Sequence, residues 1–231
     1  MKDLSNILIR FFDIVFSLLA LVVFSPILLL VILILKLTGE REIFYLQDRI
    51  GKDEKVFKLI KFATMLKNSS NIGSGEITLA NDKRVLPFGK FLRKTKINEL
   101  PQLINIFKGD MSIIGPRPQT QKYFDAFTIE NKKYIKKLKP GLSGIGSIVF
   151  RDEEKILEKV ANPVEFDLKI ITPYKGELEK WFFDNMSVKV YFELIIFTII
   201  VVLFSDRFNI YQYYKDLPTP PGELKNLGIG E

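Results

Sequence analysis

The segment from Ile97 to Pro118 (INELPQLINIFKGDMSIIGPRP) gathers the side chains best suited to chemistry on phosphates. Glu99 and Asp110 supply carboxylates, and Arg117 stands between two prolines that restrict its backbone, an arrangement that suits bidentate binding of phosphate. A helix that begins at Asn98 would place Glu99 beside N–H groups that attract anions or a metal–phosphate pair. Each feature alone is typical of a structural role, but their combination indicates a phosphate site.

The composition narrows the kind of chemistry. The 231 residues include no Cys and no His, which excludes thiol nucleophiles, disulfides, Cys/His zinc sites and triads with a His base. Catalysis would therefore use carboxylates, Lys or Arg, hydroxyls, backbone groups or a hard oxygen-bound cation. The net charge of +7 suits an anionic partner, such as a phosphorylated small molecule, an acidic membrane face or nucleic acid.

The elements expected around this segment form one α+β domain that is mostly helical. Residues 42–48 and 56–62 are typical of the two strands of a short β-hairpin. Asn98 is the expected N-cap of a helix with Pro101 in its first turn, and Gly109 is expected to end that helix. Further expectations are helices over residues 88–93 and 119–138, a loop over 66–83 and a frayed tail over 222–231.

A long apolar run near the amino terminus indicates contact with a membrane. No charge occurs from Ile14 to Leu35, and a straight helix over this stretch would reach roughly 33 Å, about one hydrocarbon thickness. Pro26, directly after Ser25, would divide the run into pieces of about 14 and 10 residues, too short to span alone. Basic residues on both flanks agree with a hairpin that has both ends in the cytoplasm. A kinked spanning helix and a buried soluble helix are the alternatives.

A second apolar run, Val188–Phe204, contains Lys189 and Glu193 and has a marginal length for spanning. A helix that lies in the membrane interface or packs on the first segment is favoured.

Several segments together resemble the bacterial sugar transferases, which are monotopic phosphoglycosyl transferases acting on polyprenyl phosphate. The family pattern runs approximately Asp-Glu-Leu-Pro-Gln-Leu, Lys-Gly-Asp-Met-Ser and Gly-Pro-Arg-Pro, and this chain has NELPQL, KGDMS and GPRP in the same order. The segments VFKLIKFATM and KPGLSGIGSIVFR are similar to two further family motifs. The resemblance covers nearly the whole chain and implies the minimal form of the family.

The resemblance also implies a location. FSP at Phe24–Pro26 is similar to the break of the family's re-entrant helix, so we expect residues 1–38 to form a re-entrant membrane helix-hairpin broken at Ser25 and Pro26. Residues 39–231 are then the cytosolic catalytic domain, with an interfacial helix near 188–204, on the cytoplasmic face of the bacterial inner membrane.

The implied activity is transfer of a phosphosugar from a UDP-sugar to polyprenyl (undecaprenyl) phosphate with release of UMP, the first membrane step of bacterial glycan assembly. In the family's two-step route a carboxylate attacks the β-phosphate, and the lipid phosphate then takes the phosphosugar. Mg²⁺ on the diphosphate would neutralise developing charge, with Glu99 as a candidate metal ligand. Membrane lipids and downstream glycosyltransferases are further implied partners.

One departure from the family affects the mechanism. The family nucleophile is the Asp of the Asp-Glu pair, and this chain has Asn98 there, beside an intact Glu99. Four interpretations follow: Glu99 is the nucleophile; the covalent step is skipped and Glu99 is a base or metal ligand; another carboxylate such as Asp110 or Asp152 substitutes; or the protein is inactive, naturally or through an engineered Asp→Asn change. A second departure is Ala63, where the family usually has a basic residue.

Carried over by position, four basic residues would bind phosphate: Lys61, Arg93, Arg117 and Arg151. For Lys61 and Arg93 the alternative is a plain surface charge. A catalytically inactive paralogue that binds nucleotide-sugar or serves as an assembly scaffold is the competing hypothesis, and Asn98 favours it. Nucleic-acid binding is disfavoured, because the basic residues are not interleaved with aromatic ones and a membrane anchor does not suit that role.

Overall fold

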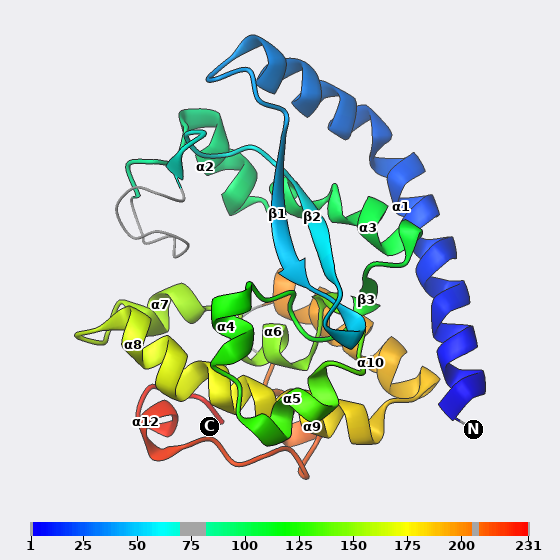
Figure 1. Ribbon diagram of the computed structural model, residues 1–231, viewed down its shortest axis with the longest axis vertical. Helices are drawn as coiled ribbons and strands as arrows, with labels where there is room; N and C mark the ends of the chain where they lie inside the picture. The colour runs from blue at the N-terminus through cyan, green and yellow to red at the C-terminus, as the bar shows by residue number, and fades with distance from the viewer. Residues whose placement is uncertain (1, 70–81, 205–207, 231) are drawn as a thin grey trace. The chain divides into compact units, whose positions relative to one another are not determined.

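The computed structural model describes residues 2–69, 82–204 and 208–230, without the side chains of residues 2 and 3. Across these residues the chain is mostly helical and contains two small two-stranded sheets, which confirms the predicted α+β class (Figure 1). The chain forms two compact units: unit 1 comprises residues 1–13, 49–57 and 109–231, and unit 2 comprises residues 14–48 and 58–108. These units describe how the chain packs and do not test where a membrane would begin. The predicted membrane part, residues 1–38, and the predicted cytosolic part, residues 39–231, therefore stay a prediction.

Helix α1, Lys2–Leu37, is continuous through Pro26. The predicted separation into two helical pieces at Ser25 and Pro26 is therefore not found, although the ribbon of α1 is bent (Figure 1). The reason is local: Pro26 lacks the N–H that would bond to the carbonyl of Val22, and the Ser25 hydroxyl donates to that carbonyl instead, at 2.7 Å. The re-entrant topology itself stays a prediction.

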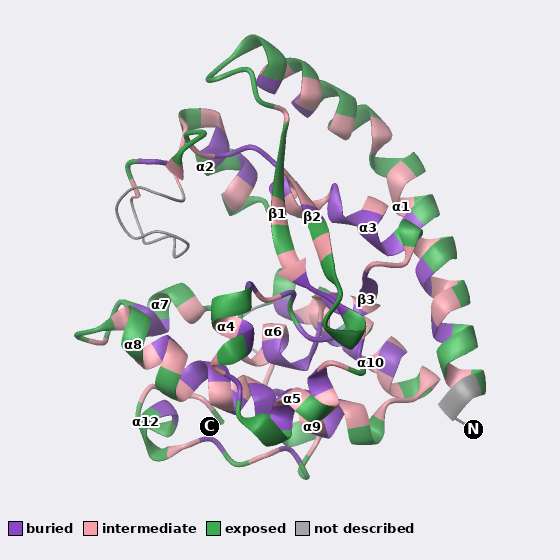
Figure 2. Ribbon diagram, in the orientation of Figure 1, coloured by how far each residue is buried: buried purple, intermediate pink, exposed green. Residues whose placement is uncertain are grey.

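Helix α1 has the length and composition of a membrane-crossing segment. Residues 4–37 are the one stretch among the described residues that meets both criteria, and only 11% of its most apolar window is buried. Figure 2 shows most of α1 as exposed or intermediate. A core helix of a soluble protein would be mostly buried, so the structure disfavours that alternative.

The start of α1 is held within unit 1 by Asp13, which is only 1% exposed. Its Oδ1 accepts hydrogen bonds from the Ser112 hydroxyl at 3.0 Å, the Ile113 N–H at 2.9 Å and the Tyr191 hydroxyl at 2.9 Å. Three donors converge on one buried carboxylate oxygen, which satisfies its hydrogen bonding away from water.

The two predicted strands are present as the paired strands β1 (Phe44–Ile50) and β2 (Val56–Phe62), which lie mostly in unit 2. The last two residues of β1 and the first two residues of β2 belong to unit 1. The remaining unit 2 elements are α2 (Pro87–Lys94), the tight turn η3 (Ile97–Glu99) and α3 (Gln102–Lys108). Their shared core contains Val31 and Leu35 from α1, Phe62 from β2 and Leu92 from α2.

In unit 1 the strands β3 (Ser112–Ile114) and β4 (Gly141–Ser143) pair in parallel, with Ser112 opposite Gly141 and Ile114 opposite Ser143. Parallel neighbours need a long crossover, which α4 (Gln121–Asp125) and α5 (Ile129–Ile135) provide. The predicted helical stretch over residues 119–138 is therefore two short helices.

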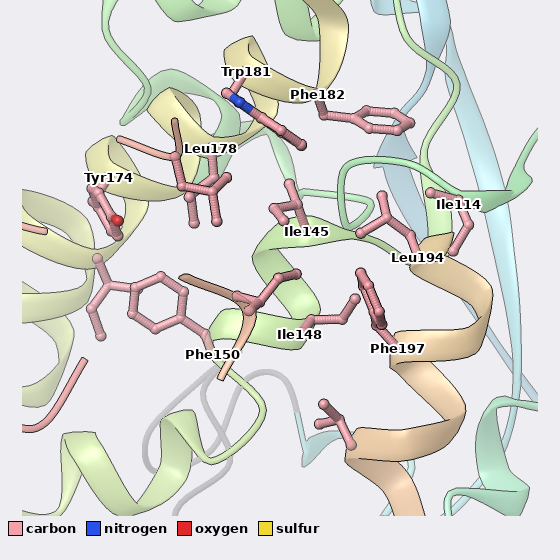
Figure 3. Packing of buried hydrophobic residues seen from close by; sticks show 14 of the residues in the cluster. Ile114, Ile145, Ile148, Phe150, Tyr174, Leu178, Trp181, Phe182, Leu194 and Phe197 are labelled. Atoms are coloured by element: carbon pink, nitrogen blue, oxygen red, sulfur yellow. The ribbon is translucent and has the colours of Figure 1, made fainter. Parts of the chain in front are cut away.

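The main core of unit 1 lies among β3 and three helices: α6 (Ile145–Val149), α9 (Thr172–Asn185) and α10 (Val188–Leu203). Figure 3 shows Ile145 and Ile148 of α6 facing side chains of α9 and α10, such as Leu178 and Leu194. The other helical elements of unit 1 are η1 (Lys52–Glu54), α7 (Glu153–Leu157), α8 (Pro163–Phe166), η4 (Asp167–Ile171), α11 (Ile210–Tyr213) and α12 (Gly222–Lys225).

Two predictions about the carboxyl-terminal part have different outcomes. Helix α10 confirms a helix over the second apolar run, and Ile196, Ile199 and Leu203 leave an apolar stripe more than half exposed along it. The prediction of a frayed tail after Gly222 is wrong, because α12 forms there and Leu224 is fully buried in the core of unit 1.

Candidate functional site

Lys61 and Glu99 form the centre of the candidate site in unit 2. The Lys61 Nζ lies 4.0 Å from Oε1 of Glu99, and the two side chains are 18% and 17% exposed. Lys61 comes from β2 and Glu99 from η3, so two segments far apart in the sequence bring a cation and a carboxylate together. A pair of this kind, partly withdrawn from water, is more strongly coupled than a pair on the open surface.

The backbone around Glu99 differs from the prediction. Asn98 lies inside the tight turn η3 and not at a helix N-cap, and α3 begins only at Gln102. Pro101 has no N–H to bond with the carbonyl of Ile97, and this carbonyl accepts from the N–H of Leu100 instead, at 3.1 Å. The predicted helix beginning at Asn98 is therefore wrong, and so is the expected help of a helix dipole at Glu99. The end of the helix is right, since Gly109 follows α3 with φ +97°.

Asn98 is buried within unit 2, with 6% of its surface exposed. Its Oδ1 has no hydrogen-bond partner among the residues that the structure describes. A buried amide oxygen without a partner costs free energy, so its occurrence next to Glu99 needs an explanation. A ligand atom or a cation that meets this oxygen would remove the cost.

Asn105 of α3 fixes the strand that carries Lys61. Its Oδ1 accepts from the N–H of Ile60 at 3.0 Å, and its Nδ2 donates to the carbonyl of Lys58 at 2.8 Å. The side chain is 1% exposed and so satisfies two backbone groups of β2 away from water. The sequence prediction missed Asn105, since an amide inside an apolar helix pattern gives no sign of what it will contact.

Helix α2 carries Arg93 and packs closely on the segment that follows β2. A Cβ at Gly89 would lie 2.1 Å from the carbonyl oxygen of Thr64, so only glycine permits this approach. The same carbonyl accepts the N–H of Leu86 at 3.0 Å, just before α2 begins. Arg93 then lies with its Nη1 3.8 Å from the Sδ of Met65.

A buried ion pair, also missed from the sequence, supports this side of unit 2. The Arg84 guanidinium lies 2.6 Å from Oδ2 of Asp82, and both side chains are 7% exposed. Hydrogen bonds from Arg84 lower the pKa of Asp82 to about 2, with a smaller contribution from the charge of Arg93. The signal in the sequence is an Asp and an Arg two residues apart at the end of the predicted loop, and this pattern alone is too common to identify an ion pair.

The remaining predicted residues lie elsewhere in the chain. Arg117 and Arg151 belong to unit 1, as do Asp110 and Asp152, the other carboxylates considered as nucleophiles. Arg151 donates to the carbonyl of Val202 near the end of α10, at 3.2 Å. Lys61, Arg93, Asn98 and Glu99 all belong to unit 2, where Lys61 and Glu99 lie side by side, and Ser25 and Pro26 lie on α1.

The residues of unit 2 fit a magnesium ion that is shared with a substrate phosphate. Within the described residues there is no cluster of three or more Asp, Glu, His or Cys side chains that could hold a metal alone. Mg²⁺ commonly uses only one or two carboxylates together with substrate phosphates and water. The carboxylate of Glu99 and the unpartnered Oδ1 of Asn98 are hard oxygen donors of the kind that such a site requires.

Comparison with known proteins identifies the family. The model of the family described as bacterial sugar transferase matches residues 4–205. The chain belongs to this family. The match contains all but the first two residues of α1, unit 2 in full and the greater part of unit 1, so it includes every candidate site residue named above.

Three relatives show what this sugar transferase is similar to. It is 38% identical to a UDP-N-acetylgalactosamine-undecaprenyl-phosphate N-acetylgalactosaminephosphotransferase of Aeromonas hydrophila, over 61% of this chain and 33% of that protein. It is 37% identical to the UDP-glucose:undecaprenyl-phosphate glucose-1-phosphate transferase of Escherichia coli, over 79% and 39%. It is 35% identical to the exopolysaccharide production protein ExoY of Sinorhizobium fredii, over 69% and 76%. The chain thus spans well under half the length of the first two relatives.

Proposed function

We propose that this sugar transferase moves a phosphosugar from a UDP-sugar to polyprenyl (undecaprenyl) phosphate and releases UMP, as the first membrane step of bacterial glycan assembly. Two of the relatives are named for reactions of this kind. The observation that carries the proposal for this chain is the Lys61–Glu99 pair, in which a partly buried cation and carboxylate lie 4.0 Å apart inside the matched region. Phosphoryl transfer needs cations to hold the phosphate and a group that acts at phosphorus, and this pair offers both.

In the proposed mechanism Lys61 and Arg93 bind the diphosphate of the UDP-sugar, and Glu99 acts at the β-phosphorus. A carboxylate oxygen of Glu99 attacks that phosphorus, the bond to the UMP oxygen breaks, and an acyl phosphate that carries the sugar remains on the enzyme. An oxygen of polyprenyl phosphate then attacks the same phosphorus and frees Glu99. Asn98 is a neutral amide and cannot form this acyl phosphate.

Direct transfer is the alternative route, with the lipid phosphate attacking the UDP-sugar while Glu99 serves as a base or metal ligand. Arg117 and Arg151 stay proposed phosphate ligands on the strength of the resemblance. When Mg²⁺ is bound, it would neutralise charge on the diphosphate, and Glu99 and Asn98 are the residues of unit 2 that would hold it.

The proposed location is the bacterial inner membrane, with the catalytic domain on the cytoplasmic face. The largely exposed apolar surface of α1 and the apolar stripe of α10 support it. Both surfaces would be costly in water and favourable in lipid.

The decisive experiment measures UMP release and lipid product together. The purified protein is incubated in detergent with Mg²⁺, a short polyprenyl phosphate and a panel of UDP-sugars. We expect UMP release with at least one UDP-sugar, and a matching lipid-linked diphosphate sugar by mass spectrometry. Absence of both products across the panel contradicts the proposed transfer.

A second candidate function is that of a catalytically inactive protein that binds nucleotide-sugar and serves as an assembly scaffold. Asn98 favours this function, because it stands where the family has its nucleophilic Asp. Under that function the pair of Lys61 and Glu99 would hold a nucleotide-sugar without turnover. Binding of UDP-sugar in calorimetry, together with no UMP release across the panel, is the result that would support it.

A further inference from the structure

Unit 2 contains a cavity of about 220 Å³ at the end of α1. Its walls come from three places: Leu35 and Thr38 at the end of α1, Ala63 and Met65 after β2, and Leu86 and Phe88 at the start of α2. Gly39, with φ +56°, also lines it, and a Cβ there would lie 3.1 Å from the side chain of Leu86. The turn after α1 therefore closes one side of the cavity against Leu86.

The cavity suits an apolar occupant. Two carboxylates, Glu40 and Glu42, belong to the lining, but both are already held by Lys67. The Glu42 carboxylate pairs with the Lys67 ammonium at 2.6 Å, and Glu40 accepts the Lys67 backbone N–H. An apolar cavity of about 150 Å³ can bind a six-carbon ring, so this one has room for at least one branched five-carbon unit.

Met65 connects this cavity with the phosphate-binding side of the site. It lines the cavity, and its Sδ lies 3.8 Å from Nη1 of Arg93. A molecule whose phosphate is bound by Arg93 would therefore place the first atoms of its chain beside Met65. At the other side the cavity meets α1, where Leu33 and Leu37 are 53% and 71% exposed and continue the apolar surface.

We propose that this cavity binds the isoprene unit nearest to the phosphate in the polyprenyl phosphate acceptor. The proposal rests on the proposed function for the identity of the acceptor, and it adds which part of the lipid is recognised and by which residues. After UMP has left in the first step, Arg93 takes the phosphate of the acceptor. Met65 contacts the first carbons, and Ala63, with its small side chain, leaves the space that the branched unit fills.

The first test fills part of the cavity with a larger side chain. Ala63→Leu adds three carbons to a residue that is 8% exposed in the cavity wall. We expect the KM for the polyprenyl phosphate to rise at least tenfold, while the KM for a straight-chain alkyl phosphate and that for the UDP-sugar change less than twofold. Ala161→Leu, at an exposed position in unit 1, is the matched control and should change none of them.

The second test uses the unmodified protein and needs no turnover. A polyprenyl phosphate with a diazirine on its first isoprene unit is photolysed on the protein, and the labelled peptides are identified by mass spectrometry. We expect labelling at Met65, Leu86 or Phe88, and no competition by a diacyl phospholipid. Labelling elsewhere, or full displacement by the phospholipid, overturns the proposal.

The two proposals fail in different ways. If the protein makes lipid-linked product but Ala63→Leu keeps the acceptor KM and the label maps elsewhere, the cavity is not the acceptor subsite and the proposed function stands. If the label maps to the cavity and neither UMP nor lipid product forms with any UDP-sugar, lipid binding stands and the proposed transfer is contradicted.

Discussion

The ammonium nitrogen of Lys61 lies 4.0 Å from a carboxylate oxygen of Glu99, and less than one-fifth of either side chain is exposed. Asn105 of α3, the helix that follows the turn with Glu99, bonds to the backbone of β2 on the amino-terminal side of Lys61. The pair is therefore held by the fold of unit 2 and does not depend on two flexible surface chains finding each other.

Glu99→Gln should abolish UMP release, because the amide keeps the shape of the side chain but removes the oxygen that can act at phosphorus. Loss of a nucleophile or base costs several powers of ten, so we expect a fall of at least about a thousandfold. A discontinuous assay of UMP with the best UDP-sugar checks this. Glu158→Gln, which alters an exposed carboxylate of unit 1, is the control and should be unchanged. A fully active Glu99→Gln variant would show that the active site lies elsewhere.

Asn98→Asp should preserve or increase UMP release, since it restores the carboxylate that the family uses. The substitution exchanges Nδ2 for a second carboxylate oxygen and keeps Oδ1, which is buried and has no partner among the described residues. A positioned nucleophile can be worth several powers of ten in rate. Intact-mass analysis of enzyme trapped with UDP-sugar should show a phosphosugar adduct. Slower turnover than in the unmodified protein would mean that the site works through a different nucleophile or by direct transfer.

Asn105→Ala should destabilise the protein by about 2–4 kcal/mol, because two partly buried backbone groups of β2 lose their partners. The same change frees the strand beside Lys61, so we expect the KM for the UDP-sugar to rise as well. Urea unfolding in detergent, followed by far-UV circular dichroism, gives the stability change. Asn226→Ala, at an exposed position, serves for comparison. An unfolding free energy equal to that of the unmodified protein would contradict the role given to Asn105.

The stability of unit 1 should fall as the pH rises from about 5 to 8. Burial raises the pKa of Glu179 to about 8, although the N–H of Gly146 and the charge of Lys175 act in the opposite direction. Between its unfolded pKa near 4.5 and its folded pKa, the folded state holds one more proton than the unfolded state, so unfolding becomes easier by up to about 1.4 kcal/mol per pH unit.

Glu179→Gln should remove this dependence, since the amide cannot titrate. Urea unfolding at a series of pH values between 5 and 8 compares the two proteins. Parallel curves for the variant and the unmodified protein would mean that Glu179 does not hold its proton in the folded state.

The re-entrant topology predicts that residues 1–10 and 36–50 are both cytoplasmic. Because the chain has no Cys, Asp3→Cys and Leu37→Cys each provide a single labelling site. We expect both to resist a membrane-impermeant thiol reagent in intact cells, and replacement of Ser25 and Pro26 by Leu to expose only the Asp3→Cys site. Labelling of Asp3→Cys in the otherwise unmodified chain contradicts the hairpin.

The sequence predicts those elements whose signals are local. The strands β1 and β2, the helix α2 and the end of α3 at Gly109 were all expected from alternation, helical pattern and glycine punctuation. The parallel pair β3–β4 could not be expected, because strands of three residues are too short to show a period. The burial of Leu224 depends on distant partners in the core of unit 1, so a polar tail composition misled the prediction there.

Within the candidate site, residue types were predictable and backbone geometry was not. The resemblance to the family assigned Glu99 and Lys61 to one site, and the structure brings the two side chains together. The start of the helix was missed because the N-cap preference of Asn98 competed with Pro101, which blocks the longer-range backbone bond to Ile97 and favours a tight turn. The continuity of α1 was missed because a single side-chain bond, from Ser25 to Val22, offsets the donor lost at Pro26.

The three hydrogen bonds that end on Asp13 prevent the first part of α1 from sliding along its axis past β3 and α10. A helix anchored in this way cannot adjust to a thinner or thicker bilayer by moving up or down like a piston. Hydrophobic mismatch would have to be met by tilting, by bending or by deformation of the surrounding lipid. In the proposed membrane location, the depth of the first part of α1 is therefore set by the fold of unit 1, and the lipid must conform to it.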